Sequence, residues 1–381
     1  MTPTNLFLLS AFATATTLAS GFSLEPWPAL AKDSHWFWLF IAAPLLGRLF
    51  GDYPAAIHAL RIAAATTILY TLSQMLIEAD NYLFWLRNPV FGHIRHFGLS
   101  IGFCTVLLYS AADESPYAAA FFRITRIIGL ALVFWSGTRA AMLAWFVCLI
   151  ALSFGDHRQM KIAVVDSIIS FGLALLPPPP LPSIGLASAF RGALDARSID
   201  SLASGRLSLW LSTLYHLGYT GEFWTGAGGN GFIRIQWLQN AAITPFGHIH
   251  PHNIVIQALC DWGIVGTLLF LALPLKLLRL PEIFTNLKRN PCATIGIIYL
   301  LVTGMFDATL YLFEFLVYLT FSLAIYLSYK SPETATTTPN TITLPRIGII
   351  VAIVLLLVPH LLSLDYRIGF RWYFRTYDFP L

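Results

Sequence analysis

Residues 248–275 read HIHPHNIVIQALCDWGIVGTLLFLALPL, and this stretch does most to decide the fold. It opens with three alternating histidines and a proline, and apolar side chains then dominate from residue 253 to residue 275. A helix needs about 20 such residues to cross the hydrocarbon core of a membrane. The stretch therefore predicts a transmembrane helix that begins directly after a polar segment.

The composition of the whole chain agrees with this prediction. Of its 381 residues, 57% are hydrophobic and 11% are charged, and the mean hydropathy is +0.69. Soluble domains carry about 25% charged residues, so these values exclude an ordinary soluble protein. The net charge of +4 is small and comes without basic runs, which argues against a nucleic-acid partner. We predict an all-α, polytopic integral membrane protein.

The apolar runs predict about 11 transmembrane helices, with a range of roughly 10–12. The first run also resembles a signal peptide with a cleavage site at Ala29-Leu30-Ala31. No positive charge precedes that run, so we expect a retained helix instead. The predicted spans are residues 5–24, 35–50, 55–76, 97–112, 117–135, 139–155, 160–177, 253–275, 292–310, 313–329 and 346–364.

Lysine and arginine set the expected orientation, because they favour cytoplasmic loops. The positive loops near residues 48–61, 123–126, 157–161 and 276–289 all face the cytoplasm if the N-terminus does. The long polar loop 178–252 then faces outward. The expected divisions are an N-terminal bundle (1–177), this outer loop with amphipathic helices (178–252), a C-terminal bundle (253–364) and an interfacial tail (365–381).

The tail is the awkward part of this topology, because it also falls on the outer side. Arg367, Arg371 and Arg375 recur at every fourth residue within it. Either they form one face of a helix on an anionic outer surface, or the span count is wrong by one.

Within the outer loop, residues 205–219 have leucines near helical spacing and predict an amphipathic helix. Arg206 stands at the start of this segment. A guanidinium grips phosphate through paired hydrogen bonds, so Arg206 is a candidate diphosphate ligand. A solvated loop arginine is the simpler interpretation.

Three glycines follow the amphipathic segment. Gly226, Gly228 and Gly231 match the pattern GxGxxG, but no Rossmann context surrounds them. They indicate a tight turn or, alternatively, a backbone nest that binds an anion.

His248, His250 and His252 suggest a zinc site at first sight. Pro251 breaks the geometry that would align them, and no carboxylate lies nearby in the sequence, so we expect no metal. His252 is the better candidate as a single acid or base, with Asn253 beside it to orient a substrate, although a plain interfacial histidine fits equally well.

The cysteines lie in or beside apolar segments and indicate buried thiols: Cys104, Cys148, Cys260 and Cys292.

Two further arginines lie at outer ends of predicted spans. Arg95 and Arg139 either extend to the membrane surface or point into an outward cavity and bind an anion. Glu78 and Asp80 form an outward carboxylate pair at metal-binding spacing, but ordinary loop acids are the simpler interpretation. Several arginines and a histidine on one side of the membrane suggest a phosphate-bearing substrate and proton transfer.

These motifs resemble those of the O-antigen ligase/polymerase family. The resemblance rests on Ser136-Gly137-Thr138-Arg139, on Gly205-Arg206 with Trp210, on the glycine-rich turn, and on His252-Asn253 followed by Gly263-Ile264-Val265-Gly266. It covers roughly residues 90–330. Such enzymes are polytopic proteins of the bacterial inner membrane with a large periplasmic loop.

The resemblance implies an active site on the periplasmic face. An essential arginine and histidine of the family match Arg206 and His252, with Arg139 and Arg95 as further diphosphate ligands. The implied reaction moves a glycan from undecaprenyl diphosphate to lipid A–core, without a cofactor or metal and with inversion. A polysaccharide polymerase and a protein O-oligosaccharyltransferase remain alternatives, because the sequence does not identify the acceptor. A membrane transporter is the alternative from a different class.

Overall fold

The structure, a computed structural model, consists of helices throughout the part of the chain that it describes. The described residues are 3–23, 26–52, 54–77, 94–109, 115–155, 157–176, 185–195, 197–233, 250–278, 280–289, 291–307, 310 and 313–328. Glu78, Asp80, His248, the span predicted at 346–364 and the tail 365–381 lie outside these residues.

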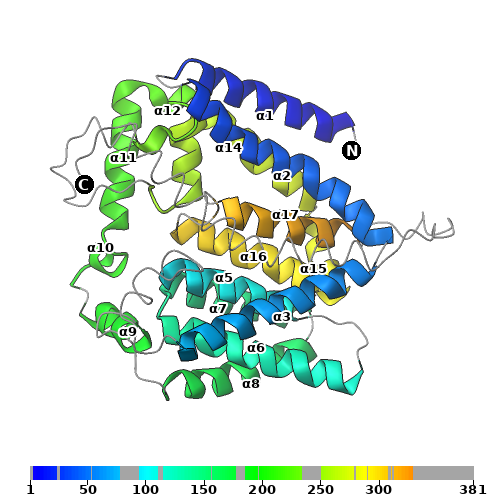
Figure 1. The fold of residues 1–381 in the computed structure, drawn as a ribbon. Helices are drawn as coiled ribbons and strands as arrows, with labels where there is room; N and C mark the ends of the chain where they lie inside the picture. Colours follow the sequence, from blue (N-terminus) through cyan, green and yellow to red (C-terminus); the bar gives the residue numbers. More distant parts are fainter. Residues whose placement is uncertain are drawn as a thin grey trace. The chain divides into compact units, whose positions relative to one another are not determined.

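The helices form two compact units (Figure 1). Unit 1 takes its described residues from Met1–Arg48, Gly192–Asn286 and Leu300–Leu327, and unit 2 from Leu49–Arg191 and Leu287–Tyr299. Unit 1 contains α1 (Pro3–Gly21), most of α2 (Pro26–Asp52), α10 (Ile199–Leu202), α11 (Arg206–Thr220), α12 (Glu222–Thr225), α14 (Ile254–Leu278) and most of α17 (Phe313–Ser328). Unit 2 contains α3 (Pro54–Ile77), α5 (Ile94–Leu107), α6 (Pro116–Ser136), α7 (Arg139–Gly155) and α8 (His157–Ala174). Helices α9 (Leu186–Leu194), α15 (Leu280–Arg289) and α16 (Pro291–Phe306) contribute residues to both units.

The helices confirm the all-α prediction and are consistent with a membrane protein. Among the described residues, three segments are long and apolar enough to cross a membrane, namely Ile57–Ile77, Pro116–Ser136 and Ile254–Leu278. Shorter apolar helices cover Asn5–Gly21, Arg139–Gly155, Pro291–Phe306 and Phe315–Ser328. The count of about 11 spans and the periplasmic position of the long loop stay predictions.

Unit 2 is a helical bundle in which α6 packs on α5 and α8. The buried acid Asp166 of α8 holds this bundle together. Its carboxylate accepts hydrogen bonds from Arg126, at 3.0 and 3.2 Å, and from Arg123 at 3.1 Å. The Arg126 guanidinium also lies 4.2 Å from the centre of the Tyr109 ring. A charge this deeply buried is tolerated only with such partners.

Unit 1 places α14 along α1 and α2. The indole of Trp262 packs edge-on to Phe12 and Trp36, with ring centres 5.1 and 6.3 Å apart. Its backbone neighbour Gly263 has φ 61° and interrupts the regular helix. A side chain at Gly263 would meet the carbonyl oxygen of Trp224 at 2.4 Å, so glycine is required there. Figure 1 shows α11 running crosswise to α1 and α2 within this unit.

The buried hydrogen bonds of Asp166 predict that replacing this acid destabilises the protein more than replacing its exposed partner Arg123. We expect Asp166→Asn to lower the free energy of unfolding by roughly 3 kcal/mol, because Arg126 would stay buried without a full counter-charge. Thermal unfolding in detergent should show a clear fall in the midpoint. The control is Arg123→Gln: the Arg123 side chain is 49% exposed, so its loss should cost about 1 kcal/mol or less. Equal effects of the two substitutions would contradict this account.

Candidate functional site

The site lies where α14 begins and α16 ends, and Asn253 fastens these two helix ends together. The side-chain oxygen of Asn253 accepts hydrogen bonds from the backbone N–H groups of Val255 and Ile256, at 2.9 and 3.1 Å. This is the usual cap of a helix N-terminus. The Asn253 amide nitrogen donates to the carbonyl oxygen of Met305 at 3.1 Å. Through these bonds Asn253 connects the start of α14 to the end of α16. Its predicted role in orienting a substrate stays a prediction.

His252 directly precedes Asn253 and contacts an acid at the end of α16. Its Nδ1 lies 3.0 Å from Oδ1 of Asp307. If Nδ1 carries the hydrogen and donates it to Asp307, the basic lone pair of the neutral ring is on Nε2. The backbone of His252 has φ 53°, a left-handed conformation that costs roughly 1–2 kcal/mol outside glycine. The surrounding contacts therefore hold the ring in a specific position.

Arg206 approaches the same carboxylate from α11. One terminal nitrogen of its guanidinium lies 4.0 Å from Oδ2 of Asp307. The side chains of Arg206 and His252 are each 20% exposed, whereas that of Asp307 is 7% exposed. The structure thus brings the two strongest candidates from the sequence to opposite oxygens of one nearly buried acid.

Asp307 was not a candidate in the sequence analysis. It lies far along the chain from His252, within the span predicted at 292–310, and no motif marks it. The available signal was its charge, because an acid in or beside a membrane span is expensive and is a functional candidate for that reason alone.

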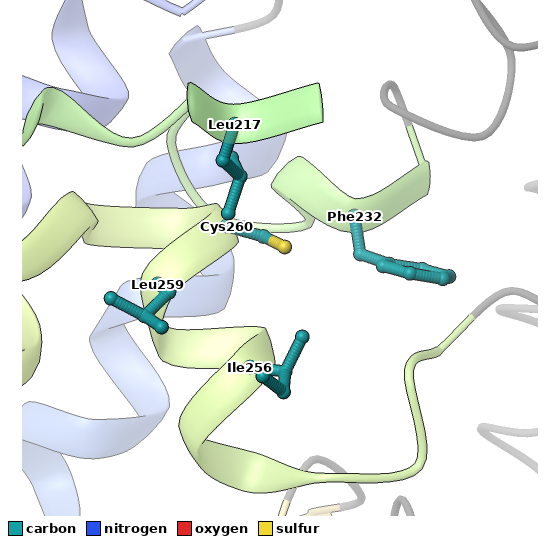
Figure 2. Close-up of a cluster of buried hydrophobic side chains, with 5 residues drawn as sticks. All are labelled: Leu217, Phe232, Ile256, Leu259 and Cys260. Carbon is teal, nitrogen blue, oxygen red and sulfur yellow. The ribbon is translucent and has the colours of Figure 1, made fainter. Parts of the chain in front are cut away.

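Trp210 connects the helix of Arg206 to the loop of His252. It lies one turn after Arg206 on α11, and its Nε1–H donates to the carbonyl oxygen of Pro251 at 2.6 Å. The Trp210 ring packs against a buried apolar cluster, which Figure 2 shows between α11, α14 and the turn that carries Phe232. The cluster consists of Leu217, Phe232, Ile256, Leu259 and Cys260. Trp210 therefore fixes the peptide that precedes the strained residue His252.

The glycine-rich segment is a tight turn docked on α14. Backbone N–H groups of Ala227 and Gly228 donate to the carbonyl oxygens of Cys260 and Asp261, both at 2.8 Å. The N–H of Gly231 donates to the Asp261 carboxylate at 2.8 Å. At Gly226, with φ 72°, a side chain would meet the Asp261 carbonyl oxygen at 2.4 Å. Because these N–H groups bind the protein itself, they do not form an anion-binding nest.

A second buried acid, Asp33, secures the same turn from α2. The N–H of Gly229 donates to the Ser20 hydroxyl at 2.9 Å, and that hydroxyl donates to Asp33 at 2.5 Å. Trp262 donates its Nε1–H to the other oxygen of Asp33 at 2.8 Å. Burial raises the pKa of Asp33 to about 6, although the bonds from Ser20 and Trp262 oppose this shift. Asp33 precedes the span predicted at 35–50.

Two candidate arginines belong to unit 2. Arg95 and Arg139 are exposed residues of unit 2, near the starts of α5 and α7. These helix starts are adjacent. A Cβ atom added at Gly98 of α5 would lie only 2.3 Å from the hydroxyl of Thr138, the residue directly before α7. Their part in binding a diphosphate stays a prediction. His250 lines the pocket beside His252, and no group of three or more metal-binding side chains occurs within the described ranges.

The fold and the site define a membrane protein in which an arginine and a histidine meet at a carboxylate near the start of an apolar helix. A protein-family model described as O-antigen ligase matches residues 124–271, from α6 into α14. The match includes Arg139, Arg206 and His252, and it confirms the predicted resemblance to the O-antigen ligase/polymerase family. No curated protein matches the chain significantly. Members of that family are membrane glycosyltransferase-like ligases and polymerases.

The raised pKa of Asp33 predicts a pH-dependent stability. Between about pH 4 and pH 6 the folded protein holds a proton on Asp33 that the unfolded chain has released, so stability falls as the pH rises through this window. In thermal unfolding, we expect the midpoint of the wild type to fall between pH 4.5 and 6.5, because its free energy of unfolding drops by an amount on the order of 3 kcal/mol or less. Asp33→Asn should flatten this slope.

The matched control for that measurement is Asp200→Asn. Asp200 is an exposed acid whose pKa is lowered by hydrogen bonds from the side chain and backbone of Ser208. It therefore titrates below the window, and its replacement should preserve the wild-type slope. A slope that persists in Asp33→Asn would show that another group is responsible.

Proposed function

We propose that this protein is an O-antigen ligase-like glycosyltransferase of the bacterial inner membrane. It moves a glycan from undecaprenyl diphosphate to lipid A–core on the periplasmic face, with inversion and without a metal. The observation that carries the proposal is the meeting of Arg206 and His252 at Asp307. The match of the family model to the segment that holds both residues supports it.

Arg206 has the chemistry to bind the leaving diphosphate. A guanidinium forms charge-assisted hydrogen bonds with phosphate oxygens, each worth roughly 1.5–3 kcal/mol. The guanidinium of Arg206 lies 4.0 Å from Asp307, at the outer limit of an ion pair. Arg139 and Arg95 are proposed as further ligands of the same diphosphate.

His252 is proposed to act as the general base. In the reaction, Nε2 takes the proton of the acceptor hydroxyl while the hydroxyl oxygen forms a bond with the anomeric carbon. The bond from that carbon to the phosphate oxygen breaks, and undecaprenyl diphosphate leaves with the electron pair. Asp307 stabilises the imidazolium that results, because its carboxylate contacts Nδ1 at 3.0 Å. Attack from the side opposite the diphosphate gives inversion.

Two related activities use the same chemistry with another acceptor. A polymerase transfers the glycan to a growing chain, and a protein O-oligosaccharyltransferase transfers it to a protein hydroxyl. Lipopolysaccharide from a deletion strain distinguishes them. Bare lipid A–core with accumulated lipid-linked long glycan supports the ligase, whereas a single repeat unit on the core indicates a polymerase. Unchanged lipopolysaccharide beside an unglycosylated surface protein indicates the third activity.

The catalytic assignment predicts the behaviour of two variants in that strain. Arg206→Ala and His252→Ala should each abolish transfer, a loss of at least about 100-fold, while the protein remains in the membrane. Arg197→Ala removes an exposed arginine of the same segment and should restore wild-type lipopolysaccharide. Normal transfer by either of the first two variants would refute the assignment.

Loss of wild-type activity on addition of a chelator would favour the metal alternative at Glu78 and Asp80.

The indole of Trp210 should matter for rate more than for stability. Trp210→Phe keeps an aromatic ring in the apolar cluster but removes the N–H that binds the Pro251 carbonyl oxygen. The peptide before His252 is then less firmly held, and we expect transfer to slow about fivefold or more with little change in thermal unfolding. Trp224→Phe is the control, because that side chain is 67% exposed. A wild-type rate for Trp210→Phe would exclude this positioning role.

A further inference from the structure

Gln257 is a buried polar residue that neither the motifs nor the proposed reaction uses. It lies on α14, one helical turn after Asn253, and is 3% exposed. It lines a small pocket together with His252 and Asp307. The other lining residues are His250, Pro251, Asn253, Ile254 and Leu310.

The orientation of the Gln257 amide is determined by its neighbour. Its Nε2 donates to the Asp261 carboxylate at 2.9 Å. A carboxylate accepts hydrogen bonds and does not donate them, so the amide nitrogen and not the amide oxygen faces Asp261. The same carboxylate oxygen accepts the N–H of Gly231, which anchors Asp261 to the glycine-rich turn. The Gln257 side chain is therefore held rigidly by the scaffold.

The amide oxygen of Gln257 is left as a buried acceptor. Within the described part of the chain, Oε1 has no hydrogen-bond partner although it is shielded from solvent. Buried polar atoms in native proteins nearly always have a partner, and an unsatisfied one is costly. A ligand that donates a hydrogen bond at this point would remove that cost.

The charges near Gln257 restrict what such a ligand is. Asp261 binds the Gln257 amide, and Asp307 lines the same pocket. An ionised phosphate oxygen accepts hydrogen bonds and cannot donate one to an amide oxygen, so the diphosphate of the donor is not the group that Oε1 meets. A neutral amide oxygen suits a neutral hydroxyl, the most abundant donor on a glycan.

We propose that Oε1 of Gln257 accepts a hydrogen bond from a sugar hydroxyl that enters the pocket beside His252. This inference rests on the proposed function, because it assumes a glycan substrate. Gln257 is then a substrate-binding residue that positions the sugar relative to the base. The hydroxyl belongs either to the acceptor sugar or to the transferred glycan, and kinetics with each substrate varied in turn distinguish the two.

The test uses the full-length protein in nanodiscs, with undecaprenyl-diphosphate-linked repeat units as donor and purified lipid A–core as acceptor. Gln257→Met removes the hydrogen-bonding atoms at similar volume. We expect the KM of one substrate to rise about tenfold, with a smaller change in kcat and in the KM of the other substrate. A rise for lipid A–core assigns the hydroxyl to the acceptor, and a rise for the donor assigns it to the transferred glycan.

A second measurement separates binding from a purely structural role. The substrate whose KM rises should stabilise Gln257→Met against heat less than it stabilises the wild type, while the other substrate should stabilise both proteins equally. If Gln257→Met does not fold, Gln257→Asn withdraws the amide from the pocket and should change the same KM. Unchanged KM values for both substrates, or equal changes in both together with a lower midpoint of the unbound protein, would overturn the inference.

His252→Ala distinguishes this failure from failure of the proposed function. If His252→Ala is inactive and Gln257→Met has wild-type kinetics, only the inference about Gln257 fails. If His252→Ala transfers glycan at the wild-type rate, the proposed function fails, and the inference, which rests on it, fails as well.

Discussion

The carboxylate of Asp307 is the interaction on which the site depends. It contacts the Nδ1 atom of His252 at 3.0 Å, and its other oxygen faces the guanidinium of Arg206. In the proposed reaction His252 takes a proton, and without Asp307 the resulting imidazolium would lack the carboxylate that stabilises it beside Arg206. Asn253 holds the end of α16 against the start of α14, so the position of Asp307 relative to His252 follows from the packing of the two helices.

The other buried acids of unit 1 stabilise the structure around this site. Asp33 and Asp261 accept hydrogen bonds from Trp262, from Gln257 and from the glycine-rich turn. That turn docks the segment after α12 on α14, and Trp210 binds the carbonyl oxygen of Pro251 just before α14. The polar groups of this unit thus serve two purposes: those around the turn stabilise the fold, and those beside the pocket are available for chemistry.

The helices were predictable because hydropathy is a local property of the sequence. The span predicted at 139–155 coincides with α7, and the amphipathic segment predicted at 205–219 is α11 shifted by one residue. The family and the candidate residues Arg206 and His252 also came from local motifs. Asp307 and Gln257 did not, because their roles depend on contacts between helices that are far apart in the sequence, or on an unsatisfied atom that only the folded chain shows.

In the proposed reaction, a diphosphate lipid and an acceptor hydroxyl meet at the Arg206–Asp307–His252 site. The most direct measurement is an electron cryomicroscopy map of the protein in nanodiscs with an undecaprenyl-diphosphate-linked glycan bound. We expect diphosphate density within hydrogen-bonding distance of Arg206, with the anomeric carbon on the side of His252. Diphosphate density in contact with Arg123 and Arg126 instead, and none at Arg206, would contradict it.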